Sequence, residues 1–314
     1  MLEILGVATP VFVIIAVGFG AVRSGLVPSA WLPALGGFVV RLALPALLFK
    51  SLSQRSFAEV MNLRYLGAYA LGALIVLGGG LLWGRFVRRE PLEKSAMMAL
   101  GMACSNSGYV GYPIALQVIG PVATVALALA MVIENMLMIP LALALADSGG
   151  ARHEAFHRTF GRALARLRTN PIIIAMVAGF VFTVFGLALP APLTRAVDMF
   201  AAASAPVALF YIGGILVGLP LRGMFADIGA VAFGKLVLHP LIVCGTLLLF
   251  GPIDPSLAAG AVLLASAPML SVYPIFGQKH GMQGFCAATL VVSTVTSFLT
   301  MSAAIWLLRA GGWA

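Results

Sequence analysis

Only a few polar side chains in this sequence lie inside long apolar runs, and these are the residues best placed to do chemistry. Glu134 is the one acid deep in any such run, and Lys235 and Arg41 are basic residues within two others. A charge at the centre of a membrane span costs at least about 2.5–3.5 kcal/mol, so each should pair or face a cavity. Lys235 and Arg41 could hold a carboxylate of a bound anion, or either could be a structural counter-ion to Glu134.

Glu134 and His239 are the candidates for carrying a proton. If Glu134 has no charge partner, burial favours its neutral, protonated form, and the side chain could carry a proton. If it pairs with Lys235 or Arg41 it stays ionised and is structural. His239, which precedes a proline, is expected to hydrogen-bond within the protein, with a role in a proton relay as the alternative.

A sodium site is the third option, because oxygen ligands suit a hard cation. The side chains that could supply them, together with backbone carbonyls, are those of Glu134, Asn135, Asn106, Gln117 and Gln278. The residues therefore leave proton coupling, sodium coupling and uniport open. The cysteines, Cys104, Cys244 and Cys286, do not have metal-ligand spacing, so we expect no metal centre and no cofactor.

The elements that carry these residues must be membrane helices. Of 314 residues, 61% are hydrophobic and 9% charged, whereas a soluble domain has roughly 25% charged residues. We predict an all-α polytopic membrane protein, because apolar runs of roughly 20 residues recur along the chain. Ten spans are expected, at 2–21, 33–51, 63–84, 95–119, 121–145, 170–188, 197–219, 228–250, 256–278 and 285–308.

The fourth and ninth predicted spans are interrupted near their middle. The fourth contains Gly108, Gly111 and Pro113, and the ninth contains Pro268 and Pro274. Irregular backbone within a membrane persists only where protein or a water-filled cavity shields it. We therefore expect each to form two half-helices joined by a short extended linker, with the linkers crossing near the bilayer centre. Half-helix N-termini just before Pro113 and near Pro274 would attract an anion there.

The second half of the chain repeats the first at a constant shift of 161 residues. The matched pairs include Pro10 with Pro171, Gly18 with Gly179, Pro45 with Pro206, Phe49 with Phe210, Ser105 with Ser266, Tyr112 with Tyr273, Pro113 with Pro274 and Gln117 with Gln278. Five spans per repeat is an odd number, so the second repeat must enter the membrane from the opposite side. This predicts two inverted five-helix repeats, 1–145 and 170–314, joined by the linker 146–169.

Asn106 is the candidate for contacting a ligand directly. Its amide can donate to a carboxylate, and the aligned residue in the second half is Ala267, so the scaffold alone does not require the asparagine. The alternative role is a hydrogen bond between helices. Weaker candidates, because most recur at symmetric positions and could equally build the crossing, are Ser105, Tyr112, Pro113, Pro268, Tyr273 and Pro274.

The sequence resembles the auxin efflux carrier family across nearly its whole length. The resemblance rests on "LALPALLFKSLS", "SNSGYVGYP", Lys235 followed by "HP", and "SVYPIFGQKHG". It implies a ten-span inverted-repeat fold with crossed fourth and ninth helices, similar also to bile acid sodium symporters and sodium/proton antiporters. Members move carboxylate-bearing organic anions, among them indole acetic acid, malonate and malate, and the resemblance points to Asn106. Many plant members carry a large hydrophilic loop where this chain has about 24 residues, so regulation through a phosphorylated loop is not expected.

The basic residues predict the orientation. Twelve Lys and Arg residues fall in loops on one side of the predicted spans and five on the other. The loop "SGGARHEAFHRTFGRALARLR" supplies most of the excess, which places it in the cytoplasm and both termini outside. The net charge of +9 is thus explained by orientation rather than by nucleic-acid binding. We expect a multi-pass protein of the cell (inner) membrane, with the lipid bilayer, an organic anion and a second copy in a homodimer as its partners.

A secondary transporter of organic anions, working by alternating access, is the function that these features favour. Small dicarboxylates are slightly preferred over auxin-like aromatic acids because two cationic side chains are present. The alternative transporter is a proton- or sodium-coupled symporter, of the bile acid symporter type, for a different organic solute. An intramembrane enzyme would need a nucleophile with a base in reach. No predicted span contains a His-Glu-x-x-His motif or paired aspartates, and the one match to that motif, "HEAFH" at 153–157, lies in the predicted linker, so we expect no enzyme. A channel is disfavoured because it would need a continuous polar lining. A membrane-embedded sensor is a further alternative.

Overall fold

The regular secondary structure of the described chain is helical. The computed structural model describes residues 2–53, 62–149, 161, 165–218 and 225–313, and every regular element in these ranges is a helix. Within these ranges, six helices are long and apolar enough to cross a membrane: Ser29–Lys50, Leu63–Val87, Val122–Gly149, Ala191–Ile215, Phe225–Leu249 and Gln283–Ala310. Shorter apolar helices cover Thr9–Arg23, Pro171–Phe185 and Pro255–Ser266. The predicted class, an all-α polytopic membrane protein, is confirmed.

The ten predicted spans correspond to these helices in three ways. The second, third, fifth, seventh, eighth and tenth are the six long helices. The first and sixth coincide with shorter apolar helices, and the fourth and ninth are broken. The count of ten and the inverted repeat therefore stay predictions.

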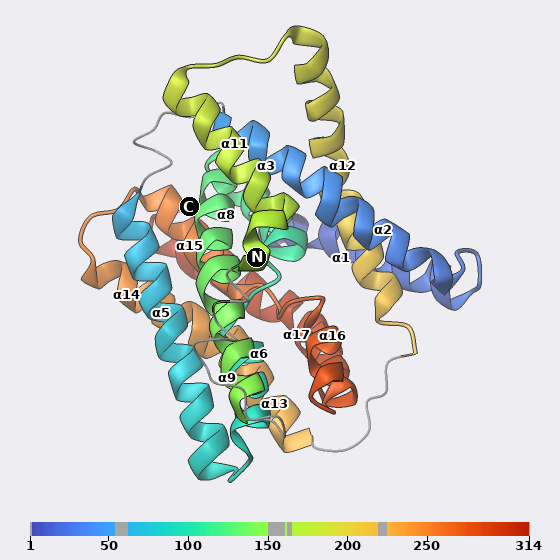
Figure 1. Cartoon of the computed structure of the whole chain (residues 1–314), viewed down its shortest axis with the longest axis vertical. Helices are drawn as coiled ribbons and strands as arrows, with labels where there is room; N and C mark the ends of the chain where they lie inside the picture. Colours follow the sequence, from blue (N-terminus) through green and yellow to red (C-terminus); the bar gives the residue numbers. More distant parts are fainter. Residues whose placement is uncertain (1, 54–61, 150–160, 162–164, 219–224, 314) are drawn as a thin grey trace.

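The helices form two groups (Figure 1). The first, here called the four-span group, consists of α1 (Leu2–Arg23), α2 (Leu32–Phe38) continuing through the π-helical turn η2 (Val39–Ala43) into α3 (Leu44–Ser53), α11 (Pro171–Phe185) and α12 (Ala191–Ile215). Within it α1 packs on α12, and α3 packs on both α11 and α12. Helices from the two halves of the sequence are thus in direct contact, and the halves do not form separate bodies.

The second group, here called the crossing group, contains both broken spans. It consists of α5 (Leu63–Leu82), α6 (Leu92–Ala103), α7 (Tyr112–Ile119), α8 (Val122–Ile133), α9 (Ile139–Gly149), α13 (Phe225–Phe233), α14 (His239–Leu249), α15 (Pro255–Ser266), α16 (Tyr273–Lys279) and α17 (Gln283–Ala310). It meets the four-span group where α7 and α17 pack on α1 and where α8 packs on α3. These contacts form the boundary between the two groups.

Glycines allow the helices of the four-span group to approach closely. A Cβ on Gly18 would overlap the carbonyl of Phe210, and a Cβ on Gly213 would overlap the carbonyl of Ile15, both across the α1–α12 contact. Between α11 and α3, a Cβ on Gly179 would lie 3.0 Å from the carbonyl oxygen of Phe49. Small residues at such contacts are how membrane helices gain packing energy without a hydrophobic driving force.

Replacing Gly213 by alanine is expected to destabilise the protein. The new methyl group would meet the backbone of α1, which cannot rotate away, and overpacking of this kind costs about 1–3 kcal/mol. The matched control is Gly229→Ala on α13, where nothing lies within 4 Å of the new Cβ. Thermal melting of both purified variants in detergent checks this. Equal melting temperatures would mean that the α1–α12 contact is not as close as described.

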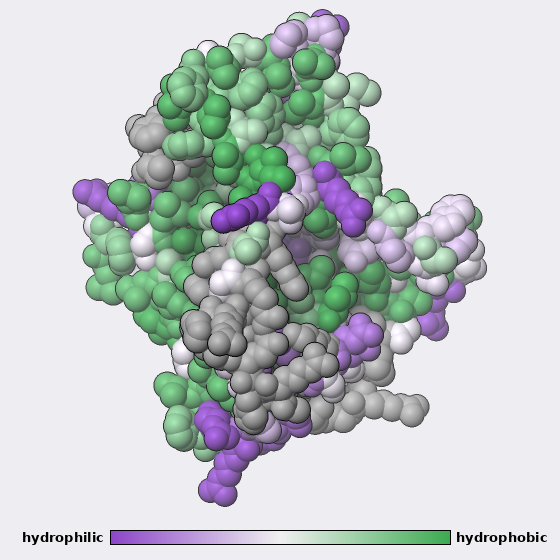
Figure 2. All heavy atoms as spheres, in the orientation of Figure 1, coloured by the Kyte–Doolittle hydropathy of each residue, from purple (hydrophilic) through white to green (hydrophobic). Residues whose placement is uncertain are grey.

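The surface is largely apolar, as a lipid-facing surface must be. Large hydrophobic side chains with more than half of their area exposed include Phe86, Phe185, Leu241, Leu248 and Leu299. Figure 2 shows hydrophobic residues over most of the coloured part of one face, with hydrophilic residues in separate patches. The protein is a multi-pass membrane protein on these grounds.

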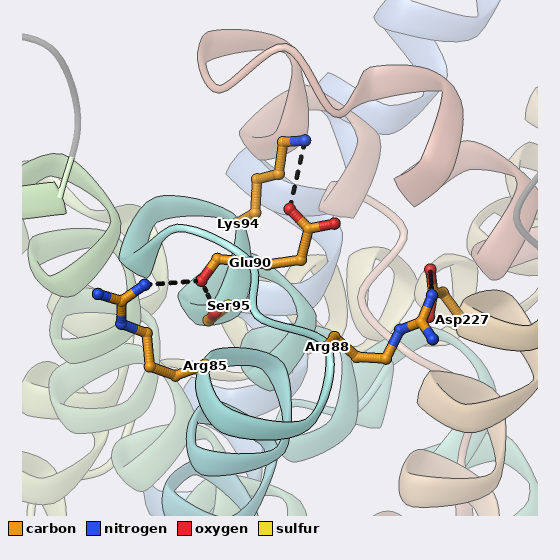
Figure 3. Close-up of polar contacts among 6 residues, drawn as sticks. All are labelled: Arg85, Arg88, Glu90, Lys94, Ser95 and Asp227. Carbon is orange, nitrogen blue, oxygen red and sulfur yellow. Dashed lines mark hydrogen bonds and ion pairs between the residues drawn. The ribbon is translucent and has the colours of Figure 1, made fainter.

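Ion pairs tie together one end of the crossing group. Arg88, after α5, contacts Asp227 on α13 at 2.6 Å, and Lys94 on α6 lies 3.4 Å from Glu90 (Figure 3). At the same end His280 Nδ1 is 2.7 Å from the Glu93 carboxylate. Figure 1 shows this end, with the α5–α6 connection, opposite the α11–α12 connection.

The predicted orientation is not tested by the structure. The predicted linker 146–169 lies largely outside the described residues, at 150–160 and 162–164. Both termini outside and a cytoplasmic linker therefore remain predictions, as does the division into the domains 1–145 and 170–314.

Candidate functional site

The fourth span breaks earlier than the sequence indicated. We expected the break at Gly108, Gly111 and Pro113, but α6 ends at Ala103 and the non-helical residues are Cys104 to Asn106. Helix resumes at once as a π-helical turn, η4 (Ser107–Gly111), which leads into α7. The half-helix N-terminus is therefore at Ser107, not just before Pro113.

Local backbone chemistry explains this correction. Pro113 directly follows the π-helical turn, in which the amide of Tyr112 bonds to the Ser107 carbonyl in the wider i to i+5 pattern. The helix continues through Pro113 into α7. Gly108 and Gly111 serve close packing instead. A Cβ on Gly108 would lie 3.2 Å from Leu44, and one on Gly111 would lie 3.0 Å from Leu264.

The ninth span breaks where predicted. α15 ends at Ser266, Ala267 is extended, and α16 begins at Tyr273 with Pro274 in its first turn. Pro268 lies within the irregular segment. The prolines mark this break correctly because one lies in it and the other starts the next helix.

The two breaks meet, as predicted. The Asn106 N–H donates to the Pro268 carbonyl at 2.7 Å, and Ser105 pairs with Met269 as an isolated antiparallel bridge. Both segments are buried, so these bonds satisfy part of the backbone that the helix breaks leave free. Each break is stabilised by the other.

Glu134 is held beside the first break by two side-chain donors. Its carboxyl group accepts from Ser107 Oγ at 2.7 Å and from the Tyr69 hydroxyl at 3.1 Å, and the backbone N–H of Ser105 lies nearby. The residue is 2% exposed and opens a π-helical turn, η5 (Glu134–Met138), between α8 and α9. Such turns often occur at functional positions in helices.

Lys235 is held beside the second break by three acceptors. Its ammonium group lies 2.8 Å from Ser105 Oγ, 2.6 Å from the Ala265 carbonyl and 2.7 Å from His239 Nδ1. It is fully buried, in the π-helical turn η7 (Gly234–Leu238) between α13 and α14. An ammonium group has three N–H donors, so Lys235 has none left for a ligand.

Ser105 joins these two charged groups. Its hydroxyl contacts Lys235, and its backbone N–H contacts Glu134. The positive charge lies at the C-terminal end of α15 and the negative charge at the N-terminal end of the helix after the first break, where helix dipoles favour each. We expected that half-helix end to face a free anion, but the Glu134 carboxylate already lies against it.

Asn106 lies at the contact between the two breaks and has unused hydrogen-bonding capacity, as does Nε2 of His239 beside Lys235. The Asn106 side chain is 5% exposed, and its Nδ2 has no hydrogen-bond partner among the residues that the structure describes. A buried unpaired donor costs about 1–3 kcal/mol. The Nδ2 group of Asn106 therefore has N–H donors available for an acceptor from outside the protein.

The comparisons with known proteins give the family. Residues 4–307 match the family described as membrane transport protein. The chain belongs to this family, the auxin efflux carrier family. It is accordingly a membrane transporter and not an enzyme.

Curated relatives support the assignment. The transporter is 33% identical over 313 residues, 99% of this chain and 98% of the relative, to the "Putative malonate transporter" of Rhizobium meliloti (strain 1021). It is 25% identical to the "Lysosomal cholesterol signaling protein" of Mus musculus, over 95% of this chain and 36% of that protein. It is 27% identical to the "Probable auxin efflux carrier component 3b" of Oryza sativa subsp. japonica, over 48% of this chain and 26% of that protein. The chain thus spans about a third or less of the mouse and rice relatives.

Other predicted site residues of the transporter have internal partners or lie elsewhere. The Tyr112 hydroxyl is 3.4 Å from Thr124 Oγ1, and the Tyr273 hydroxyl donates to the Met97 carbonyl at 2.9 Å. Both tyrosines are buried, which agrees with an architectural role. Arg41 is exposed and lies in η2 of the four-span group, not in the polar network around Ser105.

The predicted sodium ligands lie in different surroundings. The amide of Asn135 donates to Met131 O at 2.9 Å, within its own helix. Gln117 donates to Pro113 O at 3.1 Å and is exposed, as is Gln278. Glu134 and Asn106 are buried near the crossing, and sodium coupling stays a prediction.

Three residues with polar contacts, Tyr69, Ser107 and Lys50, were not singled out as candidates from the sequence. Tyr69 and Ser107 contact Glu134, yet a tyrosine and a serine in apolar runs carry no distinguishing pattern. Lys50, which the sequence assigned only to a loop side, forms a 2.8 Å ion pair with Asp198. Its partner lies 148 residues away in the sequence, so only the fold brings the two together.

Proposed function

We propose that this transporter carries small organic anions of the malonate class across the membrane by alternating access. The observation that carries the proposal is the buried, unpaired Nδ2 of Asn106 at the crossing of the two helix breaks. A carboxylate oxygen is an acceptor that would satisfy it, and charge strengthens the bond. The relative that is 33% identical, with the printed name "Putative malonate transporter", supports a dicarboxylate as substrate.

The position of Asn106 supports a site at the boundary between the two helix groups. The helical segment that begins immediately after it, η4, packs on α12. There the rings of Tyr109 and Tyr211 meet edge to face with centroids 6.1 Å apart, and Leu44 of α3 packs over Gly108. A movement of the crossing group against the four-span group would therefore shift Asn106 relative to the facing helices, as alternating access requires.

The same proposal includes ten spans in two inverted repeats. Its support is a pair of equivalent contacts: Gly18 abuts the Phe210 backbone, and Gly179 abuts the Phe49 backbone. The shift of 161 residues relates Gly18 to Gly179 and Phe49 to Phe210, so it converts each of these two contacts into the other. A two-fold relation between the halves produces such exchange, and the paired helix breaks follow from it as well.

A thermal-shift screen tests the substrate class. The purified transporter is melted with malonate, succinate, indole acetate, acetate and, as uncharged and cationic controls, glycerol and choline, each at two pH values with and without sodium. Malonate at about 100 times its Kd is expected to stabilise the protein by roughly 2.7 kcal/mol, and the controls are expected to do nothing. Stabilisation by none of the carboxylates under any condition would contradict the proposal.

A further inference from the structure

Lys50 and Asp198 form an ion pair that is not buried in the protein core. The Lys50 ammonium lies 2.8 Å from Asp198 Oδ1, and the two side chains are 36% and 41% exposed. Lys50 is on α3 and Asp198 is on α12, so both partners belong to the four-span group. Exposed ion pairs are weak, typically worth no more than about 1 kcal/mol, so this pair can open easily.

The pair lies beside the boundary that the transport movement would use. Leu44, six residues before Lys50 on the same helix, packs over Gly108 of the crossing group. The Lys50 ammonium also lies within electrostatic range of the Tyr112 phenol on α7. Lys50 therefore lies close enough to α7 for its charge to act on that helix.

Lys50 can donate a hydrogen bond to a bound anion, whereas Lys235 cannot. All three donors of Lys235 are used inside the protein, and its side chain is fully buried. Lys50 is partly exposed, and its partner is a carboxylate, the same chemical group that the proposed substrate carries. Apart from the Lys50 ammonium, the Asp198 oxygen that meets it has no hydrogen-bond partner among the described residues, so little else holds it in place.

We propose that Lys50 binds a substrate carboxylate at the boundary between the helix groups, and that Asp198 occupies Lys50 when substrate is absent. The proposal rests on the proposed function. A dicarboxylate would then displace the Asp198 carboxylate as it binds, so that the charge on Lys50 is neutralised in both states. Asp198 acts as an internal competitor of the substrate.

Opposite effects of two substitutions test this role. Lys50→Gln is expected to raise the KM for malonate tenfold or more, because the cation is lost. Asp198→Asn is expected to lower that KM two- to fivefold, because the competitor is lost and Lys50 remains. Initial rates of labelled malonate uptake into proteoliposomes give both values, and thermal shifts with malonate give the matching change in binding. Lys94→Gln, which alters an exposed lysine paired with Glu90 away from the boundary, serves as the control and should leave KM unchanged.

A purely structural ion pair would behave differently. Both substitutions would then lower the melting temperature by similar amounts and shift KM in the same direction or not at all, and that result would overturn the proposal for Lys50. Wild-type protein that transports malonate normally in the same experiment would leave the proposed function intact. Wild-type protein that neither binds nor transports any carboxylate would instead remove the proposed function itself.

Discussion

Asn106→Ala is expected to reduce malonate transport by roughly 10- to 100-fold without destabilising the protein. The loss corresponds to one hydrogen bond to a charged group, worth about 1.5–3 kcal/mol. The side chain is 5% exposed and its Nδ2 is unpaired, so its removal also relieves the cost of a buried donor without a partner. Transport and stability should therefore change in opposite directions.

The control for this variant is Asn135→Ala. Asn135 is also an asparagine within a span, but its amide is bonded to Met131 O on its own helix. We expect transport by Asn135→Ala to stay within about twofold of wild type, the change that a few tenths of a kcal/mol produces. Initial uptake rates and melting temperatures of the two variants are the measurement. Equal losses of transport in both would mean that Asn106 has no special role.

Lys235→Met is expected to destabilise the protein by about 3–5 kcal/mol, because it leaves the Glu134 carboxylate without its nearby positive charge. It also leaves Ser105 Oγ and the Ala265 carbonyl without the donor that now lies within 2.8 Å of each. Glu134→Gln, which keeps an acceptor for Ser107 and Tyr69 but loses the charge, should cost less.

The double variant distinguishes a coupled pair from two separate sites. If the two charges stabilise each other through Ser105, Lys235→Met combined with Glu134→Gln should recover 1 kcal/mol or more of what the single variants predict by addition, about the coupling seen between residues of one network. Denaturant unfolding of the four proteins in detergent supplies the cycle. Strict additivity would show that the network around Ser105 does not couple Lys235 to Glu134.

The sequence predicts the helix breaks better than the chemistry around them. Prolines and the repeat at 161 residues located both interrupted spans, because a proline restricts backbone conformation whatever surrounds it. The position of the first break was wrong by several residues, since a π-helical turn places Pro113 in the start of α7. A local change of hydrogen-bond pattern of this kind leaves no signal in residue types.

The partners of the charged residues were harder to predict from the sequence than the charged residues themselves. Glu134 and Lys235 both have polar partners, as expected for a charge in an apolar run. Which groups compensate them depends on the crossing of segments more than 100 residues apart, and only the fold brings Ser105 between the two. Lys50 was overlooked because it lies near the end of its span, where a lysine can reach the membrane surface and needs no partner.

Exchange of labelled malonate shows whether Asn106 at the helix crossing binds a carboxylate substrate. Proteoliposomes are loaded with unlabelled malonate and diluted into trace labelled malonate, with the same buffer and sodium concentration on both sides, so that no ion gradient is needed for the label to enter. We expect rapid label accumulation with wild-type protein and strongly reduced exchange with folded Asn106→Ala. No exchange of malonate by wild-type protein, or equal exchange by the variant, would contradict carboxylate binding by Asn106.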